Sequence, residues 1–472
     1  MAAKSYFASA SFIKALCKGI AGYRFLNDRQ QFHFAQLIWE EGIKRRVHKT
    51  REGYISIGHR ELERRFGRGR FKAINEELGI FETTPNWYHN AHRTARQNST
   101  KGYRLSPQVQ AVKDRYLKPR ADAVTRLVYL DSKDDLKTLK SVPEPIASKE
   151  YDDPLGVTAT AWRDAKPFNR VPVDLELLRE LDHTLNWLLR PECLAQNDLF
   201  LKLSVEKISR CIEWVRLIIR LAQTDIAGRG HVIHRYAECR TGRLYARGMS
   251  LQTAPRLVRK AALHGLYDYD IENCHYAIFD QLAARFGYQA EAVRHYLIHK
   301  REVREGIASR VGIRIEQAKM CLLALMFGAR TIDRPDNAIP TEIGSAKARM
   351  LYRDTEFSAL AADVKAGREV ILDGWPKRRT TLLNDLGKKV KLSEKAEVKM
   401  AHIIQGIEAM AIRAAIDLYP DEIVLLMHDG FVTTRTVDVK MVEHRVFEET
   451  GYRLQLSGGV IVLPPDLEFS KF

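Results

Sequence analysis

The segment that most constrains this 472-residue chain is residues 425–432, which read LLMHDGFV. An apolar run of strand length leads to Asp429 and Gly430, and a second apolar run leaves them. This pattern predicts a β-hairpin whose tip carries one carboxylate. A carboxylate that loses water needs a compensating cation. We therefore expect Asp429 to share a divalent metal with an aspartate from a distant part of the chain.

Net charge limits the partners of the protein. The chain carries a formal charge of +17 and a pI near 9.5, which favours a polyanion, nucleic acid before a membrane. No apolar run has transmembrane length, so no membrane partner is expected. The six cysteines lie far apart without a CxxC pair, which argues against zinc and for a reducing compartment. We expect a cytoplasmic protein of two or three domains.

The N-terminal part, residues 1–130, is predicted to be a mostly helical DNA-binding domain. Its order is helix, short strand at 54–57, two helices separated by residues 67–69, and a hairpin with a cationic loop, which is the order of a winged helix. It resembles the winged modules of plasmid replication initiators. A small solvated helical domain is the alternative. Cations expected on the recognition helix and the wing are Arg64, Arg65, Arg68, Arg70, Lys72, His92, Arg93, Arg96 and Lys101.

Residues 131–175 mix acids, proline and lysine and are predicted to be a linker. The periodicity of 176–228 then predicts an antiparallel helical pair. Beyond it, Arg243, Gln252 and a predicted strand at 259–263 place cations and amides on turns and strand edges, as contacts with phosphate would require.

A strand that alternates acids with apolar or aromatic residues follows at 267–272 and leads into a helix. In strand geometry, Asp268, Asp270 and Glu272 point to one face, where they would repel one another unless a cation is bound or some of them project into water. Either Asp268 or Asp270 is the acid expected to meet Asp429.

Farther along, Lys319, Leu323 and Phe327 are spaced four residues apart and share one helix face. A cation, an aliphatic and an aromatic side chain in a row suit a triphosphate and a stacked base. The alternative is a core-packing stripe with a lysine reaching out to solvent. Lys377, Arg378 and Arg379 lie in a basic hairpin that is either a template-phosphate contact or a solvated loop.

The order of these motifs resembles that of family A DNA polymerases and of the related single-subunit phage and mitochondrial RNA polymerases. The resemblance covers about residues 228–472, from the TGR segment through K-x7-F-G and M-A-x3-Q-G to HDG. It implies an α+β right-hand polymerase fold of palm, fingers and thumb behind the winged-helix domain. The implied ranges are a thumb-like segment at 176–228, palm at 229–280 and 386–472, and fingers at 281–385.

The resemblance also implies roles for individual residues. Asp270 and Asp429 would bind two Mg²⁺ ions, with Mn²⁺ as a possible substitute. Lys319 and Arg314 would hold the incoming nucleoside triphosphate, and Phe327 would stack near the nascent base pair. Arg243 and Gln252 would hold primer or template backbone, His428 would lie beside the primer terminus, and Gln405 would reach the minor groove. The implied activity is DNA-directed DNA synthesis by a monomer on a nucleic-acid template and primer, in replication of a phage, plasmid or other mobile element.

Several positions depart from the family pattern. His275 stands five residues after Asp270, where the DNA enzymes place the glutamate that selects the sugar, so deoxy- and ribonucleotides both stay open. Residues 1–175 show no paired-acid exonuclease pattern. Two alternatives therefore stand beside a DNA polymerase: an RNA polymerase or primase on the same fold, and a DNA-binding replication or regulatory protein whose polymerase fold is inactive.

Overall fold

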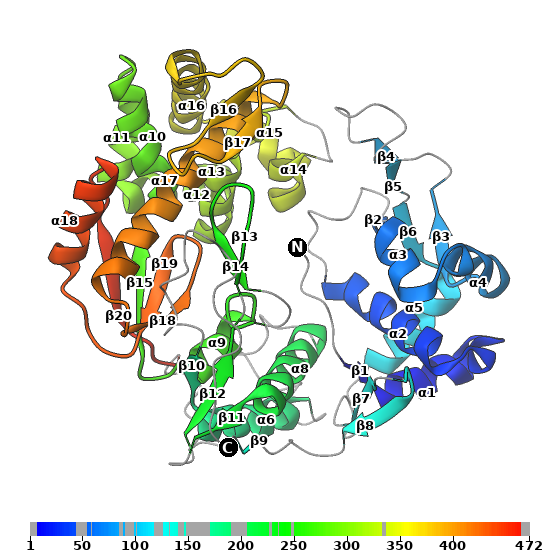
Figure 1. Cartoon of the computed structure of the whole chain (residues 1–472). Helices are drawn as coiled ribbons and strands as arrows, with labels where there is room; N and C mark the ends of the chain where they lie inside the picture. Colours follow the sequence, from blue (N-terminus) through cyan, green and yellow to red (C-terminus); the bar gives the residue numbers. More distant parts are fainter. Residues whose placement is uncertain are drawn as a thin grey trace.

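The computed structural model describes residues 7–43, 54–57, 59–84, 88–89, 99–100, 102–117, 126–131, 133–139, 146–147, 170–189, 205–225, 229–234, 236–246, 250–332 and 337–463. Within these residues, buried apolar side chains form three clusters. Figure 1 shows the corresponding regions: an N-terminal region at the right, a region around α6, α8 and α9 at the bottom, and a large region around β15 at the left.

The N-terminal region follows the predicted order of elements. Its antiparallel sheet has the order β2-β6-β3, so the last strand of the region lies between the first two. A separate pair is formed by β4 and β5. The elements are α1 (Ala10–Gly19), η1 (Tyr23–Phe25), α2 (Asp28–Ile43), β2 (Ile55–Ser56), α3 (His59–Phe66), α4 (Arg70–Leu78), β3 (Phe81–Thr83), β4 (Tyr88–His89), β5 (Ser99–Thr100), β6 (Gly102–Leu105) and α5 (Pro107–Leu117).

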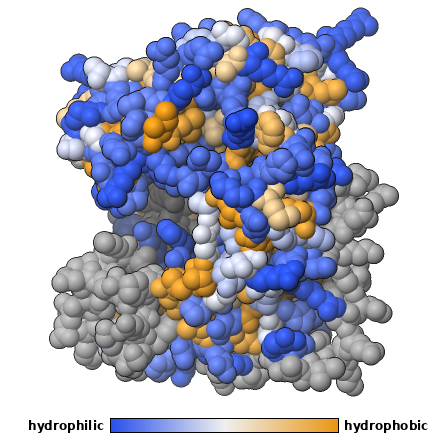
Figure 2. All heavy atoms as spheres, turned by 90° about the vertical axis from the view of Figure 1, so that its left-hand side faces the viewer, coloured by the Kyte–Doolittle hydropathy of each residue, from blue (hydrophilic) through white to orange (hydrophobic). Residues whose placement is uncertain are grey.

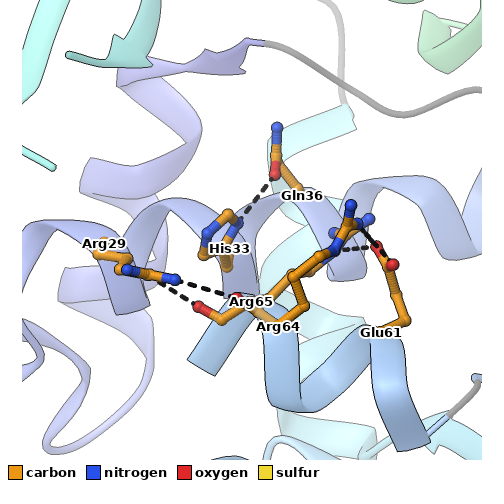
Figure 3. A network of polar contacts seen from close by, with 6 residues as sticks. All are labelled: Arg29, His33, Gln36, Glu61, Arg64 and Arg65. Atoms are coloured by element: carbon orange, nitrogen blue, oxygen red, sulfur yellow. Dashed lines mark hydrogen bonds and ion pairs between the residues drawn. The ribbon is translucent and has the colours of Figure 1, made fainter. Parts of the chain in front are cut away.

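A polar network joins α2 to the end of α3 (Figure 3). The guanidinium of Arg29 donates to the backbone oxygens of Arg64 and Arg65, at 2.9 and 3.0 Å, and so satisfies carbonyls that the helix end leaves open. Arg64 and Arg65 both pair with Glu61, and Arg65 is buried. The prediction that Arg65 lies on a DNA-facing surface is therefore wrong, because its side chain packs inside the domain.

The predicted linker at 131–175 is partly ordered into strands. β1 (Ala8–Ser9), β7 (Leu127–Leu130) and β8 (Leu136–Leu139) form one sheet. β9 (Ile146–Ala147), β10 (Arg170–Val173), β11 (Gln223–Thr224) and β12 (Gly230–Ile233) form another. Composition missed these strands because they are two to four residues long and several pair with distant segments, such as β10 with β12. The other residues of the predicted linker, apart from 131, 133–135 and 174–175, lie outside the described part of the chain.

Helices α6 (Leu175–Leu188) and α8 (Val205–Leu221) form the predicted helical pair. Arg216 of α8 donates to both carboxylate oxygens of Asp182 of α6, at 2.8 and 3.0 Å, and both side chains are buried. Helix α9 (Arg256–Ala262) packs in the same core. The prediction of a strand at 259–263 is therefore wrong. Pro255 stands immediately before the first helical residue, and Val258, Ala261 and Ala262 face the core at helical spacing.

The central sheet of the large region has the strand order β18-β19-β15-β20, with each neighbouring pair antiparallel. Its strands are β15 (Tyr267–Ile271), β18 (Ile423–Leu426), β19 (Gly430–Thr433) and β20 (Leu456–Val460). Tyr269 of β15 stacks on Phe431 of β19, with ring centroids 5.6 Å apart, in the core that also holds α10 (Cys274–Arg285), α17 (Ala396–Leu418) and α18 (Val439–Thr450). Because side chains alternate along a strand, Asp268 and Asp270 lie on the opposite face.

Two glycines let the neighbouring strands close on β15. A Cβ at Gly430 would lie 2.3 Å from the backbone oxygen of Tyr269, and a Cβ at Gly458 would lie 2.4 Å from that of Asp268. Gly430 is therefore required for the close pairing of β19 with β15. It is the first residue of β19 and follows a tight turn in which Met427 N donates to Gly430 O at 2.8 Å.

Further helices and hairpins extend from this sheet (Figure 1). They are the hairpin β13 (Tyr236–Glu238) and β14 (Leu244–Ala246), the helices α11 (Glu291–Ile298), α12 (Lys300–Val311), α13 (Ile315–Met326), α14 (Ala338–Ile343), α15 (Ser345–Arg353) and α16 (Thr355–Gly374), and the hairpin β16 (Thr381–Leu383) and β17 (Lys389–Lys391). Figure 2 shows that the face toward α18 is mainly hydrophilic, with scattered apolar residues. In the described part of the chain, no helix combines the length and apolar character needed to cross a membrane.

Candidate active site

The structure brings Asp270 and Asp429 together. Asp270 lies opposite Gly430 in the β15–β19 register, and Ile271 N donates to Asp429 O at 2.9 Å. Water reaches the Asp270 side chain, but the surrounding protein removes part of its hydration. This desolvation, followed by the charges of Asp429 and Asp268 and a hydrogen bond with Asp429, raises the pKa of Asp270 to about 8. The predicted convergence of these two acids is confirmed.

Asp268 has different neighbours from Asp270. Burial raises the pKa of Asp268, while the cations Arg259, Arg256 and Lys260 of α9 act in the opposite direction. Asp268 thus faces a cationic helix, and Asp270 is the acid that hydrogen-bonds with Asp429. Glu272 does not share their face, as β15 ends at Ile271 and Glu272 pairs with Lys300 of α12.

The donor set at Asp270 and Asp429 fits one kind of metal site. Among the described residues, no group of three or more His, Cys, Asp or Glu side chains is arranged to hold a metal ion. A closed structural site is therefore not built there. Mg²⁺ commonly binds through one or two carboxylates and fills its remaining positions with waters and substrate phosphates. Two adjacent carboxylates, one of which resists ionisation without a cation, match that arrangement.

Helix α13 presents its predicted stripe to solvent. Its buried residues are Ala318, Cys321, Leu322, Leu325 and Met326. Lys319 is exposed, and Leu323 and Phe327 are 37% and 40% exposed. The alternative of a core-packing stripe is therefore wrong. The ammonium of Lys319 lowers the pKa of Asp270, so this stripe begins beside the acid pair.

Arg314 immediately precedes α13. Its backbone N–H donates to Oε1 of Gln317 at 3.1 Å, which caps the helix start, while its side chain is exposed. The guanidinium makes no hydrogen bond or ion pair with any described residue, so it is available to an anion.

A buried ionic network lies beneath Phe327. The carboxylate of Glu408 on α17 is fully buried and contacts both Nη2 of Arg243 and Nε2 of His275, the latter at 2.7 Å. Arg243 and His275 are themselves 2.8 Å apart. The ring of Phe327 meets that of His275 edge to face, with centroids 4.9 Å apart. His275 is thus held from below by Glu408 and touches the stripe of α13 above.

Glu408 is a site residue that sequence reasoning missed. The available signal was a single acid between Ile403 and Ile416, in a mostly apolar part of a long helix. A buried carboxylate of that kind requires a cationic partner.

Two predicted nucleic-acid contacts are corrected. Gln252 is buried, and its amide bridges β14 and β18 by accepting from Ala246 N at 3.0 Å and donating to Leu244 O and Leu426 O at 3.1 and 3.0 Å. Arg243 is buried and paired with Glu408. Both side chains have polar partners inside the protein, so they serve the structure of the site and do not lie on a nucleic-acid surface.

Other predicted contact residues are accessible. The ring of His428 is exposed and packs against Tyr245, with centroids 4.9 Å apart. Gln405 is half-buried on α17, and its amide makes no hydrogen bond with the described residues. Arg68 and Arg70 are exposed at the start of α4. His92, Arg93, Arg96 and Lys101 lie outside the described residues.

The basic hairpin is partly available to a ligand. Lys377, Arg378 and Arg379 are exposed before β16, and Lys389 and Lys391 are exposed on β17 around the buried Val390. Lys377 donates to Asp373 O at 3.1 Å. Lys388 is committed to Glu238 of β13, with Nζ and Oε2 2.7 Å apart, and so joins the two hairpins.

Comparison with known proteins gives a distant structural likeness. No protein-family model and no curated protein matches the chain. The chain is similar to the solved structure of the POL domain of Pol1 from M. smegmatis in complex with DNA primer-template and dNTP, with 16% sequence identity and a TM-score of 0.38. The match covers 68% of this chain and 57% of that one, so it spans little more than half of the mycobacterial chain.

Proposed function

We propose that the protein catalyses template-directed nucleotidyl transfer, as a DNA-directed DNA polymerase. The observation that carries the proposal is the meeting of Asp270 and Asp429 beside the exposed stripe of Lys319, Leu323 and Phe327. An acid pair that needs a cation thus adjoins a surface with a cation for phosphate and a ring for a base.

Each residue has a task in this reaction. Lys319 and Arg314 bind and orient the triphosphate, and Phe327 packs against the base or sugar of the nucleotide. The 3′-oxygen of the primer attacks the α-phosphorus, the new phosphodiester bond forms, and pyrophosphate leaves. Two Mg²⁺ ions held by Asp270 and Asp429 would lower the pKa of the attacking hydroxyl and neutralise charge on the phosphates.

Accessible cations outside the acid pair support a nucleic-acid partner. Lys377, Arg378 and Arg379 offer a contact for template phosphates, and Arg68 and Arg70 offer one at the start of α4. The strand order β2-β6-β3 behind two consecutive helices supports a winged-helix role for the N-terminal region. The residues around α9 to α18 would then act as palm and fingers, with α6 and α8 as the thumb-like segment.

RNA synthesis is the second candidate. The observation that favours it is His275, which carries no carboxylate of its own and is held by Glu408 from another helix. A ring at this place does not exclude a 2′-hydroxyl by charge, so ribonucleotides remain acceptable substrates.

The test is primer extension with deoxy- or ribonucleoside triphosphates, on primed and unprimed templates, with Mg²⁺. We expect deoxynucleotide extension of a primer, and a loss on the order of 10³-fold in Asp429→Asn, because several kcal/mol of charge stabilisation disappear with the ligand. The matched control is Asp421→Asn, an exposed acid near the start of the same hairpin, which should retain full activity. Unprimed ribonucleotide synthesis would select the second candidate. Absence of extension with every nucleotide, with DNA binding retained, would favour a DNA-binding protein with an inactive polymerase fold.

A further inference from the structure

A second cationic surface, on α9, adjoins the acids. Helix α9 lines a cleft of about 320 Å³ with Arg256, Arg259 and Lys260. Asp268, Asp270 and the β20 residues Ser457 to Val460 line it as well. Along β15 the charge of Lys319 acts on Asp270, whereas the charges of α9 act on Asp268. The acid row therefore runs between two separate cationic surfaces.

The two arginines of this cleft are not held by polar contacts within the described part of the chain. Arg259 is half-buried, and burial lowers its pKa despite the nearby charge of Asp268. Neither Arg256 nor Arg259 makes a side-chain hydrogen bond or an ion pair with a described residue. Lys260, in contrast, donates to Val462 O at 3.1 Å and holds the end of β20 against α9. A half-buried guanidinium that forms no hydrogen bond is costly, and a hydrogen-bonded anionic ligand would relieve that cost.

Two glycines of β20, Gly458 and Gly459, line another wall of the cleft. Gly458 is required because a Cβ there would collide with β15, but a Cβ at Gly459 would have no atom within 4 Å. Gly459 has no positive φ either, so its backbone does not demand glycine. A glycine without a packing reason beside a charged cleft leaves room for a ligand to approach the backbone closely.

From this arrangement we propose that the cleft between α9 and β20 binds the sugar-phosphate backbone of the strand being extended, whose 3′ end lies at Asp270 and Asp429. The proposal rests on the function proposed above and assigns Arg256, Arg259 and Gly459 to that strand. A triphosphate fits the cleft less well, because the exposed aromatic and aliphatic stripe that a base requires lies on α13, beside Lys319.

The affinity for a primed template tests the proposed strand-binding cleft without catalysis. Arg256→Gln/Arg259→Gln should lower the affinity for primed template by about tenfold or more at ~0.1 M salt, and should reduce the slope of log K against log[salt] by about one to two. The nucleotide KM should stay within twofold. The matched control removes two exposed cations, Arg353→Gln/Lys365→Gln, and should leave the affinity for primed template unchanged.

Uncharged backbone linkages, placed in the primer or in the template, show which of the two strands the arginines contact. When one of the last few primer linkages is a methylphosphonate, the arginine double variant should lose less than about twofold further affinity for primed template. The phosphate charge that the arginines contact is then already absent. The same linkage in the template strand should leave the effect of the double variant at its full size. Equal coupling to both strands, or a raised nucleotide KM with unchanged DNA affinity, overturns the proposal.

Gly459→Val gives a test that folding does not confound. The thermal midpoint should stay within about 1 °C, because the added atoms meet open space. Affinity for primed template should fall several-fold. Unchanged affinity in Gly459→Val would overturn the close approach to β20. These binding measurements are independent of the primer-extension test. If no nucleotide is incorporated but the coupling to one strand is as expected, the proposed polymerase activity is refuted and the strand-binding site is retained.

Discussion

At the scale of one residue, the surroundings of Asp270 disfavour the charge of its own carboxylate. Loss of hydration and the adjacent Asp429 both disfavour its charged form, so its pKa rises from 3.8 to about 8. Between about pH 4 and pH 8 the folded protein therefore retains a proton that the unfolded chain has released. Stability then falls as pH rises through this window, and the decrease is complete above pH 8.

This decrease of stability with rising pH gives a prediction for the metal-free protein. With EDTA present, Asp270→Asn should gain stability relative to the parent protein as the pH rises from 5 to 8, because the variant has no charge to form. Since water screens the site, the gain should be on the order of 1–2 °C in Tm. Mg²⁺ should stabilise the parent protein more at pH 8 than at pH 5, because it binds the deprotonated acids. Thermal unfolding of both proteins checks this, and parallel pH profiles would contradict it.

Glu408 is a second carboxylate removed from water, and its partners are side chains of the protein itself. Its buried carboxylate is shared by Arg243 and His275, so removal of its charge leaves Arg243 buried without an anion. We expect Glu408→Leu to cost about 3–5 kcal/mol of unfolding free energy. Glu408→Leu/Arg243→Met should recover most of that loss, because no buried charge remains. Urea unfolding measures both. If the double variant is no more stable than the single one, the buried pair is not the cause.

At the scale of elements, α13 shows what a helix contributes to the site. Periodicity places Lys319, Leu323 and Phe327 on one face but does not decide whether that face meets protein or solvent. The packing decides it, because the core takes Ala318, Leu322 and Leu325. The side chains at Lys319 and Phe327 are thereby left for a ligand.

Lys319→Ala should therefore raise the nucleotide KM about tenfold or more, because one charge-assisted contact with phosphate is worth about 1.5–3 kcal/mol. Affinity for primed template should change less than twofold. Lys319→Arg should restore part of the loss. Glu316→Ala, at an exposed position in the first turn of the same helix, is the control and should leave KM unchanged. Steady-state extension with one nucleotide gives the values, and a loss of DNA affinity without a change in KM would refute the assignment.

At the scale of the whole molecule, the excess of positive charge is spread over several regions. Exposed arginines lie at the start of α4, on α9 and before β16, and each region belongs to or adjoins a different part of the fold (Figure 1). A polyanion that contacts several of them releases many counterions, so its affinity should depend steeply on salt.

The N-terminal contribution can be separated from the rest. Arg68→Gln/Arg70→Gln in the full chain should reduce the salt slope for duplex DNA by about one to two and should lower affinity at low salt. The rate of extension at saturating DNA should stay unchanged, because these residues are far along the chain from the acid pair. Lys14→Gln/Lys18→Gln removes two exposed cations of α1 and should have no effect. Fluorescence anisotropy across a salt series provides the slopes.

The sequence by itself determined those features that depend on neighbours along the chain. The hairpin with Asp429 at its tip, the strand of Asp268 and Asp270, and the shared face of α13 all follow from local alternation and periodicity. The helix α9 was missed because it has only seven residues, and over so short a segment helical spacing of apolar residues does not distinguish a helix from a strand. The strands of the predicted linker were missed because each is stabilised by pairing with a segment that local composition does not reveal.

The tertiary structure alone decided which side chains are used for what. It placed Asp270 against Asp429 and turned Asp268 toward α9, although both acids occupy the same face of one strand. It buried Gln252 and Arg243, and it brought Glu408 beneath His275. The physical reason is that burial and charge pairing depend on which distant segments pack together. Spacing along the chain sets the direction of a side chain but not the partner that it meets.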